Sequence, residues 1–301
     1  MTSKAGILIP VHNKLEYTRR CIPMLTELLD QNPLREQMAY EVVVIDDGSS
    51  DGTADWLREH HPGVHLLTGD GSWWWSGSIN RGARYASEKL KCQWVVLWNN
   101  DIIPANGYFG HLTGLMLSAG PGVIIGSTIC DYHQPDQVWS MGGYYNPFNG
   151  NKYMLRDNDA RGINHTVTAD WLTGMGTAIP CNIFEEVGYW NEKDFPQYFG
   201  DADFTWRASR KGCQLSVDPR LVLYNDTNNT GFMHGGSFKK LLKSLTSLTS
   251  KYNIVIEWRF YRMHARSPLA FLFLAWKYFR YIGGFFKWKV LNALGIKKNY
   301  P

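Results

Sequence analysis

The chain has 301 residues, enough for one large α/β domain or for a domain with an appendage. Hydrophobic residues make up 44% and charged residues 19%, a composition that excludes an intrinsically disordered chain. The net charge of +4 hides an asymmetry, because the residues from Lys239 onward contain 13 Lys and Arg but only one acid. An acidic body with a basic, aromatic tail suggests an enzyme with a surface-binding appendage.

The five cysteines are scattered along the chain, without a CxxC pair. They are typical of small buried side chains in a reducing compartment. The N-terminal residues lead directly into an apolar segment and show neither the length nor the cleavage site of a signal peptide. We therefore expect a cytoplasmic protein.

The first hundred residues alternate between strand and helix patterns. Short apolar, β-branched runs predict strands at 5–11, 41–45, 64–67 and 94–98. Helical spacing of apolar residues predicts helices at 15–29 and 77–90, and Asp51 is the expected N-cap of another between them. This alternation predicts an α/β fold with an open, Rossmann-like, mostly parallel sheet and helices on both faces.

The second half is less regular. We expect strands at 122–127, 174–179, 214–217 and 221–224 and a helix at 203–211. A polar, glycine-rich loop follows at 226–236, and the pattern after Ser237 predicts long helices to the end of the chain. In open α/β sheets ligands bind beyond the carboxyl ends of the strands, and the polar clusters of this sequence fall there.

Two of these clusters follow strands directly. Asp46-Asp47-Gly48-Ser49 offers carboxylates that can accept hydrogen bonds from a base or a ribose. Asn99-Asn100-Asp101 offers an oxygen ligand for a hard cation such as Mg²⁺ or Mn²⁺. Each cluster alone is equally compatible with a turn whose side chains cap the next helix.

Three further features are chemically suggestive but ambiguous alone. Asp201 and Asp203 begin a helix and fit either a general base or acids placed on the helix dipole. His234 lies between flexible segments and fits a metal ligand or a structural histidine. Trp73, Trp74 and Trp75 lie in an expected loop between glycines, where at least one faces a ligand or packs as a lid.

The order and spacing of these clusters resemble glycosyltransferase family 2, whose catalytic domain has the GT-A type fold. The resemblance covers roughly residues 5–237 and rests on 7–13, 42–53, 77–82, 95–101, 172–174 and Asp201. In general style the chain is similar to bacterial rhamnosyltransferase-like members that build surface polysaccharides such as O-antigen and capsule.

The resemblance implies a role for each matching residue. It places Asp201 as the catalytic base and Asp101 as the last acid of the DxD motif, which holds Mn²⁺ or Mg²⁺ on the donor diphosphate, with His234 as a further metal contact. The donor-binding residues it implies are Pro10, Asp46, Asp47, Trp75, Asn80 and Asn99. On the acceptor side it implies Gly174 and Asp203.

The sequence departs from the family pattern at three places. Asn99 stands where the first acid of the DxD motif is expected, so Asp101 would carry most of the metal binding. Gly200 replaces the acid that usually precedes the base. The tryptophan triplet replaces a segment that is usually smaller, and would shape the sugar pocket differently.

The expected protein is therefore an inverting, metal-dependent hexosyl- or rhamnosyltransferase. Residues 1–237 would form the GT-A catalytic domain, with a nucleotide-binding half at 1–104 and an acceptor half at 105–237, and 238–301 a helical extension. The donor would be a UDP- or dTDP-sugar and the acceptor a saccharide, free or lipid-linked.

Residues 252–288 hold 13 aromatic side chains, but their longest uncharged run, 267–276, is too short to span a bilayer, which takes ~20 residues. The segment 252–301 fits an interfacial element on an anionic membrane, which would place the protein at the inner face of the cell membrane. It also fits a helical cap over the catalytic domain or a dimer interface. We expect no nucleic-acid partner, because no recognised binding motif accompanies the basic tail.

Other classes fit less well. A dinucleotide-dependent dehydrogenase should show GxGxxG after the first strand, where this chain has Pro10-Val11-His12-Asn13. A nucleotidyltransferase should carry a glycine-rich phosphate loop near the N-terminus. A non-catalytic carbohydrate-binding protein on the same fold remains the main alternative, although it would not need Asp101, Asp201 and His234 together.

Overall fold

The computed structural model describes residues 2–160, 162–226 and 237–296, and the chain forms two compact units. The first unit contains the described residues of 2–144, 154–196 and 200–226, and the second those of 145–153, 197–199 and 237 onward. The helices are α1 (Leu15–Asp30), α2 (Thr53–His60), α3 (Trp74–Arg84), the π-helical turn η1 (Tyr85–Lys89), α4 (Tyr108–Ser118), α5 (Asp157–Ala160), α6 (Ile183–Val187), α7 (Gly200–Arg210), α8 (Phe238–Thr246), α9 (Ile254–His264) and α10 (Leu269–Ala293). The strands are β1 (Ser3–Val11), β2 (Met38–Asp46), β3 (His65–Thr68), β4 (Trp94–Leu97), β5 (Ile102–Pro104), β6 (Val123–Asp131), β7 (Val138–Ser140), β8 (Gly143–Asn146), β9 (Asn151–Met154), β10 (Val167–Ala169), β11 (Ala178–Pro180) and β12 (Gln214–Asn225).

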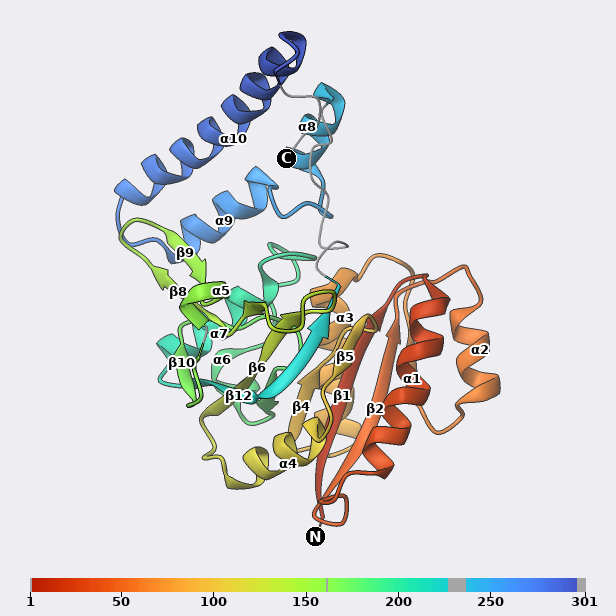
Figure 1. The fold of residues 1–301 in the computed structure, drawn as a ribbon. Coiled ribbons are helices and arrows are strands. Elements are labelled where there is room, and N and C mark those ends of the chain that lie inside the picture. The colour runs from red at the N-terminus through yellow and green to blue at the C-terminus, as the bar shows by residue number, and fades with distance from the viewer. Residues whose placement is uncertain (1, 161, 227–236, 297–301) are drawn as a thin grey trace. The chain divides into compact units, whose positions relative to one another are not determined.

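The first unit is built on one mixed, mostly parallel sheet (Figure 1). Its strand order is β10-β12-β6-β11-β4-β1-β2-β3, and β5 and β7 pair with β12 and β6. The strands β1 to β4 run parallel to one another, as do β6 and β12, while β11 is antiparallel to its neighbours β4 and β6. This arrangement confirms the expected α/β class.

Residues on β1 alternate between two hydrophobic cores because successive side chains in a strand point to opposite faces. Ile7 and Ile9 belong to the core under α1, α2 and α4, whereas Leu8 belongs to the core under α3, α6 and α7. The central β1 residues Ala5, Ile7, Leu8 and Ile9 are fully buried, as the continuous apolar run predicts for a central parallel strand.

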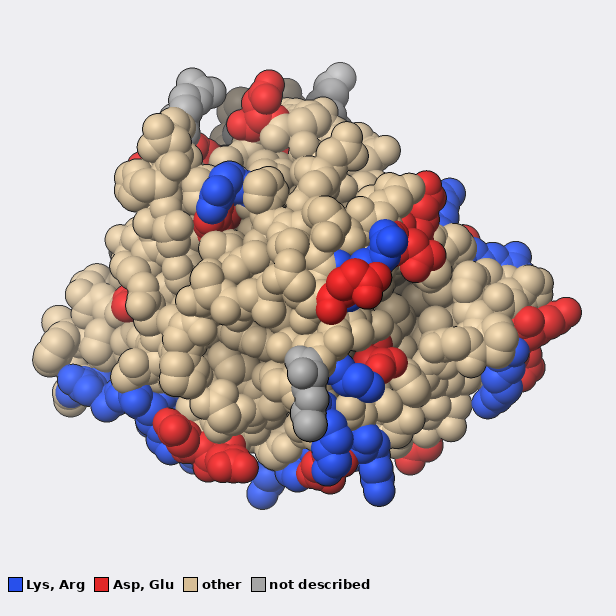
Figure 2. Space-filling model, turned by 90° about the horizontal axis from the view of Figure 1, so that it is seen from below, with Lys and Arg blue, Asp and Glu red and all other residues tan. Residues whose placement is uncertain are grey.

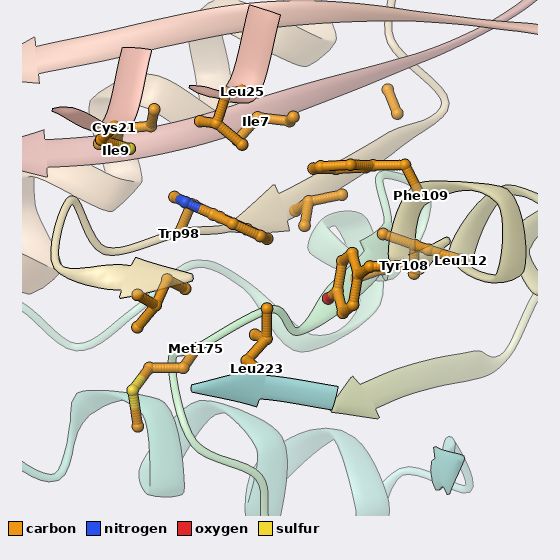
Figure 3. Close-up of a cluster of buried hydrophobic side chains, with 14 of the residues drawn as sticks. Ile7, Ile9, Cys21, Leu25, Trp98, Tyr108, Phe109, Leu112, Met175 and Leu223 are labelled. Carbon is orange, nitrogen blue, oxygen red and sulfur yellow. The ribbon is translucent and has the colours of Figure 1, made fainter. Parts of the chain in front are cut away.

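Large aromatic side chains fill the first of these cores. Trp98 follows β4 and stacks on Phe109 of α4, with ring centroids 5.6 Å apart, while Tyr108 meets it edge-on at 5.7 Å (Figure 3). Cys21 of α1 lies in the same cluster, and burial raises the pKa of its thiol to about 12 (Figure 3). This thiol is therefore a packing group, in agreement with the expectation from the sequence.

The structure corrects several expected element boundaries. The segment 174–179 is a strand only at its end, because Gly176 has a φ of +65° and bends the chain before β11. The two strands expected at 214–217 and 221–224 are one strand, β12, with an irregularity between Asp218 and Val222. The N-cap of α2 is Gly52 rather than Asp51, whose carboxylate instead accepts the N–H groups of Thr53 and Leu15.

The second unit is mostly helical. Ser237 caps α8 and Asn253 caps α9, each through its side-chain oxygen. Tyr261 of α9 donates a hydrogen bond to Gly150 O at 2.8 Å, which fixes the tip of the β8–β9 hairpin within this unit. No helix in the part of the chain that the structure describes is long and apolar enough to cross a membrane. The division of the chain at residues 104 and 237 stays a prediction.

Candidate active site

Three polar segments meet at the carboxyl edge of the sheet. The neighbouring parallel strands β4, β1 and β2 end there, so residues 99–101, 12–13 and 46–47 follow them at the same edge. Asp47 N donates to Val11 O at 2.9 Å, and His12 Nδ1 lies 2.6 Å from Asp47 O, which joins the ends of β1 and β2. Pro10, one of the expected donor contacts, is half-buried in β1 at this edge.

Asp46 and Asp47 are almost fully buried and shape this edge through backbone contacts. Asp46 Oδ1 accepts the N–H of Ser49 at 2.9 Å and so closes the turn. Gly48 in that turn has a φ of +72°, and a Cβ there would lie 2.6 Å from Gly71 N, so only glycine fits. The two carboxylates thus hold the loop, and their expected contact with a donor nucleotide stays a prediction.

The Asp47 carboxylate also anchors the tryptophan segment. Its Oδ1 accepts the N–H of Gly71 at 2.9 Å and its Oδ2 accepts the N–H of Trp74 at 2.8 Å. Trp74 has a φ of +54° and is the first residue of α3, so the expectation that the triplet lies in a loop is wrong for Trp74 and Trp75. Trp73 packs under the Arg81 guanidinium, which lies 4.5 Å from the ring centroid.

Trp75, Gly174 and Asp201 come together from three distant parts of the sequence. A Cβ on Gly174 would lie 2.4 Å from the Trp75 ring, so the indole packs directly against the Gly174 backbone. Gly174 N donates to Asp201 Oδ2 at 3.0 Å, and Ala202 N donates to Asp201 Oδ1 at 2.8 Å. The half-buried Asp201 carboxylate is therefore oriented at the start of α7, next to an aromatic wall.

Two expected ligand contacts lie in structural positions instead. Asn80 is buried in α3. Its side-chain amide accepts a hydrogen bond from the N–H of Trp190 and donates one to the C=O of Trp190, each at 2.9 Å. Asp203 is 1% exposed and pairs with Arg207 at 3.0 Å, while Arg207 also donates to the carbonyls of residues 187 and 189. Asn80 and Asp203 thus hold α3 and α7 to the segment around 190, and their ligand contacts stay predictions.

Asp101 lines a cavity of about 250 Å³ between α1 and the ends of β4, β6 and β12. The residue is exposed as a whole, and desolvation of its carboxyl group by the residues around it raises its pKa. Lys14 opposes the shift, and the charge of Asp226 adds to it. Asn99 is half-buried beside it, and Asn100 ties the loop to α1 through Thr18, at 3.1 Å.

Asp226 and His133 share this cavity with Asp101 and were not expected from the sequence. His133 Nε2 lies 3.5 Å from Asp226 Oδ1. Asp226 directly follows β12, as Asp101 follows the end of β4, so its place after a strand was a usable signal. Within residues 2–160, 162–226 and 237–296 no group of three His, Cys, Asp or Glu could hold a metal ion. The expected metal contact His234 lies outside the described residues.

The comparison with known protein families matches this architecture. The family model "Glycosyl transferase family 2" matches residues 6–176, more than half of the chain, and the protein belongs to this family. It is therefore a glycosyltransferase, as the order of its polar clusters indicated. The expected bacterial, rhamnosyltransferase-like character stays a prediction.

Curated and solved relatives agree with this assignment. The low-salt glycan biosynthesis hexosyltransferase Agl10 of Haloferax volcanii is 24% identical over 183 residues, which cover 58% of this chain and 55% of that protein. The chain thus spans about half the length of this relative. GalNAc-T7, solved with UDP, GalNAc and Mn²⁺, has a TM-score of 0.56 and 12% identity over 89% of this chain and 58% of its own.

A further similar structure is the mannosyltransferase PcManGT from Pyrobaculum calidifontis in complex with GDP-Man and Mn²⁺. It has a TM-score of 0.55 and 15% identity, over 97% of this chain and 85% of its own. At such identities the likeness concerns the fold alone, and it confirms the expected GT-A type architecture.

Proposed function

We propose that the protein transfers a sugar from a UDP- or dTDP-sugar to a saccharide acceptor, with inversion at the anomeric carbon. The observation that carries this proposal is the fixed Asp201 carboxylate. It is oriented by Gly174 N and Ala202 N, and Gly174 in turn packs on the Trp75 ring. A carboxylate fixed beside an aromatic wall is suited to accept the proton of a sugar hydroxyl stacked on that wall.

The reaction is a single displacement. The acceptor hydroxyl oxygen attacks the anomeric carbon while Asp201 takes its proton, and the bond from that carbon to the diphosphate oxygen breaks. The electron pair leaves with the nucleoside diphosphate. Because attack and departure occur on opposite faces, one step inverts the configuration. The buried Asp47 accepts the N–H groups of Gly71 and Trp74 and so fixes the start of α3, the helix that carries Trp75.

The site fits a divalent cation, Mn²⁺ or Mg²⁺, at Asp101. The surroundings of this carboxyl group, including Asp226, disfavour its negative charge, and a hard cation bound to its oxygen would relieve this penalty. Diphosphate oxygens and water would complete the coordination, because the described residues offer no three-ligand cluster. The cation would supply electrostatic stabilisation of the leaving diphosphate.

We also propose a lipid-linked saccharide acceptor, with a role in bacterial surface polysaccharide synthesis such as O-antigen or capsule. This part rests on the sequence resemblance and on the basic, aromatic segment 252–301. It places the protein at the inner face of the cell membrane, where lipid-linked saccharides are presented.

The test is nucleoside diphosphate release from a panel of nucleotide-sugars, with Mn²⁺, Mg²⁺ or EDTA and mixed saccharide acceptors. We expect metal-dependent release from one donor, lost in Asp101→Ala. Donor binding by calorimetry without any release across the panel would contradict the proposal and support a non-catalytic carbohydrate-binding protein on the same fold.

A further inference from the structure

Helix α10 has an apolar face on each side. Ala270, Leu274, Tyr278 and Phe285 are buried within the second unit. On the opposite side of the helix lies a second apolar row, which we call the outer stripe, and its members are between 52% and 67% exposed. The outer stripe consists of Leu272, Trp276, Phe279, Phe286 and Val290.

The outer stripe is continuous. Its residues follow the helical repeat, with Gly283 filling the one gap, so they lie on one line along the helix. A surface helix usually places charged residues on the side away from its core, and α10 does not. A contiguous exposed apolar surface of this kind marks a site of interaction.

Basic residues border the outer stripe, and acids do not. Arg280, Lys287 and Lys289 are exposed next to it. Glu257 is the only carboxylate among the described residues of the second unit. It is 4% exposed and is bonded by Lys277 Nζ at 2.5 Å and by Tyr278 Oη at 2.8 Å. The charged side chains that border the stripe are therefore all cationic among the described residues of the second unit.

An open cavity of about 690 Å³ lies beside the outer stripe. Trp276 and Arg280 line it together with the amides of Asn149 and Asn151. Guanidinium and amide groups donate hydrogen bonds to phosphate oxygens, and an indole is stable at the boundary between water and acyl chains. The cavity thus offers hydrogen-bond donors directly next to the apolar row.

We propose that α10 lies flat in the surface of an anionic bilayer, with the outer stripe among the acyl chains and its basic residues on the lipid phosphates. This deepens the proposed function by naming the surface that meets the membrane, but membrane binding needs neither donor nor acceptor. A second copy of the chain is the other candidate occupant, since the spacing also suits a helix pair. The charges disfavour a second copy, because a dimer would bring two cationic borders together. Anionic lipid instead complements these basic residues.

The experiment is sedimentation of the full-length protein with vesicles of phosphatidylcholine alone or with 30% phosphatidylglycerol. We expect binding to the anionic vesicles that weakens with salt. Trp276→Ser/Phe279→Ser should lower the partition coefficient about 30-fold or more, because two large apolar side chains are lost from the contact. Arg280→Gln/Lys287→Gln should lower it about tenfold on anionic vesicles and leave the weak binding to neutral ones unchanged.

The matched control is Leu117→Ser on α4, which removes an exposed leucine of the first unit, compared with Leu272→Ser in the outer stripe. The control should bind like wild type, and both variants should keep the wild-type circular dichroism spectrum. Unchanged binding of Trp276→Ser/Phe279→Ser would overturn the proposal. The proposal would also be overturned if the wild-type protein does not bind vesicles but forms a dimer in sedimentation velocity, and this double substitution dissociates that dimer. Because no sugar is present, either result is independent of transferase activity.

Discussion

Asp201 owes its orientation to the backbone N–H groups of Gly174 and Ala202, and this makes a nearly isosteric test possible. Asp201→Asn keeps the size of the side chain but cannot take the acceptor proton. We expect kcat to fall ~10²–10⁴-fold, the usual contribution of a general base. The donor dissociation constant, measured by calorimetry, should stay the same. A variant with wild-type kcat would exclude Asp201 as the base.

Gly174 is the second residue that determines the geometry of the site, because it has no side chain and the Trp75 ring packs against its backbone. Gly174→Ala would place a Cβ 2.4 Å from the Trp75 ring, so the indole must move. We expect a loss of ~1–3 kcal/mol in the free energy of unfolding, measured with urea, and a lower kcat/KM. Gly63→Ala is the control, because a Cβ there meets nothing within 4 Å. Equal effects of the two changes would contradict the packing of Trp75 on Gly174.

At the scale of elements, Asn80 holds α3 to the segment that precedes α7. Asn80→Ala removes the acceptor of the buried Trp190 N–H, whereas the Trp190 C=O keeps the N–H of Glu192 at 2.9 Å. We expect the free energy of unfolding to fall by ~1–3 kcal/mol, the usual cost of one unsatisfied buried group. Asn182→Ala loses one exposed hydrogen bond to Pro121 O and should cost little. A neutral Asn80→Ala would return this residue to the ligand-binding candidates.

An ion pair whose effect is sensitive to pH lies at the irregularity in β12. Arg220 holds the pKa of Asp218 below its usual range through bonds of 2.8 and 3.0 Å. The pair therefore stabilises the fold above the unfolded-state pKa of ~3.9, and this contribution is lost as the pH falls through the lower folded pKa. Asp218→Asn should lower the free energy of unfolding by ~1 kcal/mol at pH 7, given the exposed guanidinium. In urea titrations at pH 7, 5 and 3.5, a constant difference would contradict the assignment.

Local sequence patterns predicted the elements of the fold that depend on neighbouring residues. The β-branched run at 41–45 and the apolar run at 5–11 predicted strands because a central strand buries both of its faces in this sheet. Position after a strand also predicted that Asp46 and Asp101 lie at the carboxyl edge. The partners of Asn80 and Gly174 could not be predicted, because they lie 110 and 27 residues away along the chain. The left-handed backbone conformation of Trp74 is likewise accompanied by a distant contact, the hydrogen bond from its N–H to Asp47.

At the scale of the whole molecule, charge separates two kinds of surface. On the face shown in Figure 2, acidic and basic side chains lie interspersed, with no patch of a single sign. From Lys239 onward the chain instead carries 13 Lys and Arg and one acid, which is buried. In the first unit Asp47 orients the loop before α3, and Asp101 and Asp226 line the cavity. The first unit therefore suits the proposed nucleotide-sugar, whose diphosphate would bind together with a divalent cation. The second unit suits an anionic surface.

Donor and metal binding should be visible in the stability of the intact protein, because a ligand that binds only the folded state raises its free energy of unfolding. At a donor concentration of ~100 times Kd the gain is ~2.7 kcal/mol, or about 5 °C in Tm for a chain of this size. We expect this shift with the correct nucleotide-sugar and Mn²⁺, and its loss with EDTA. Asp101→Ala should abolish the metal-dependent part, whereas Asp201→Asn should retain the full shift, because a base that acts on the acceptor does not hold the donor. A full shift in Asp101→Ala would place the cation elsewhere, and a shift lost in Asp201→Asn would make that carboxylate a donor contact rather than the base.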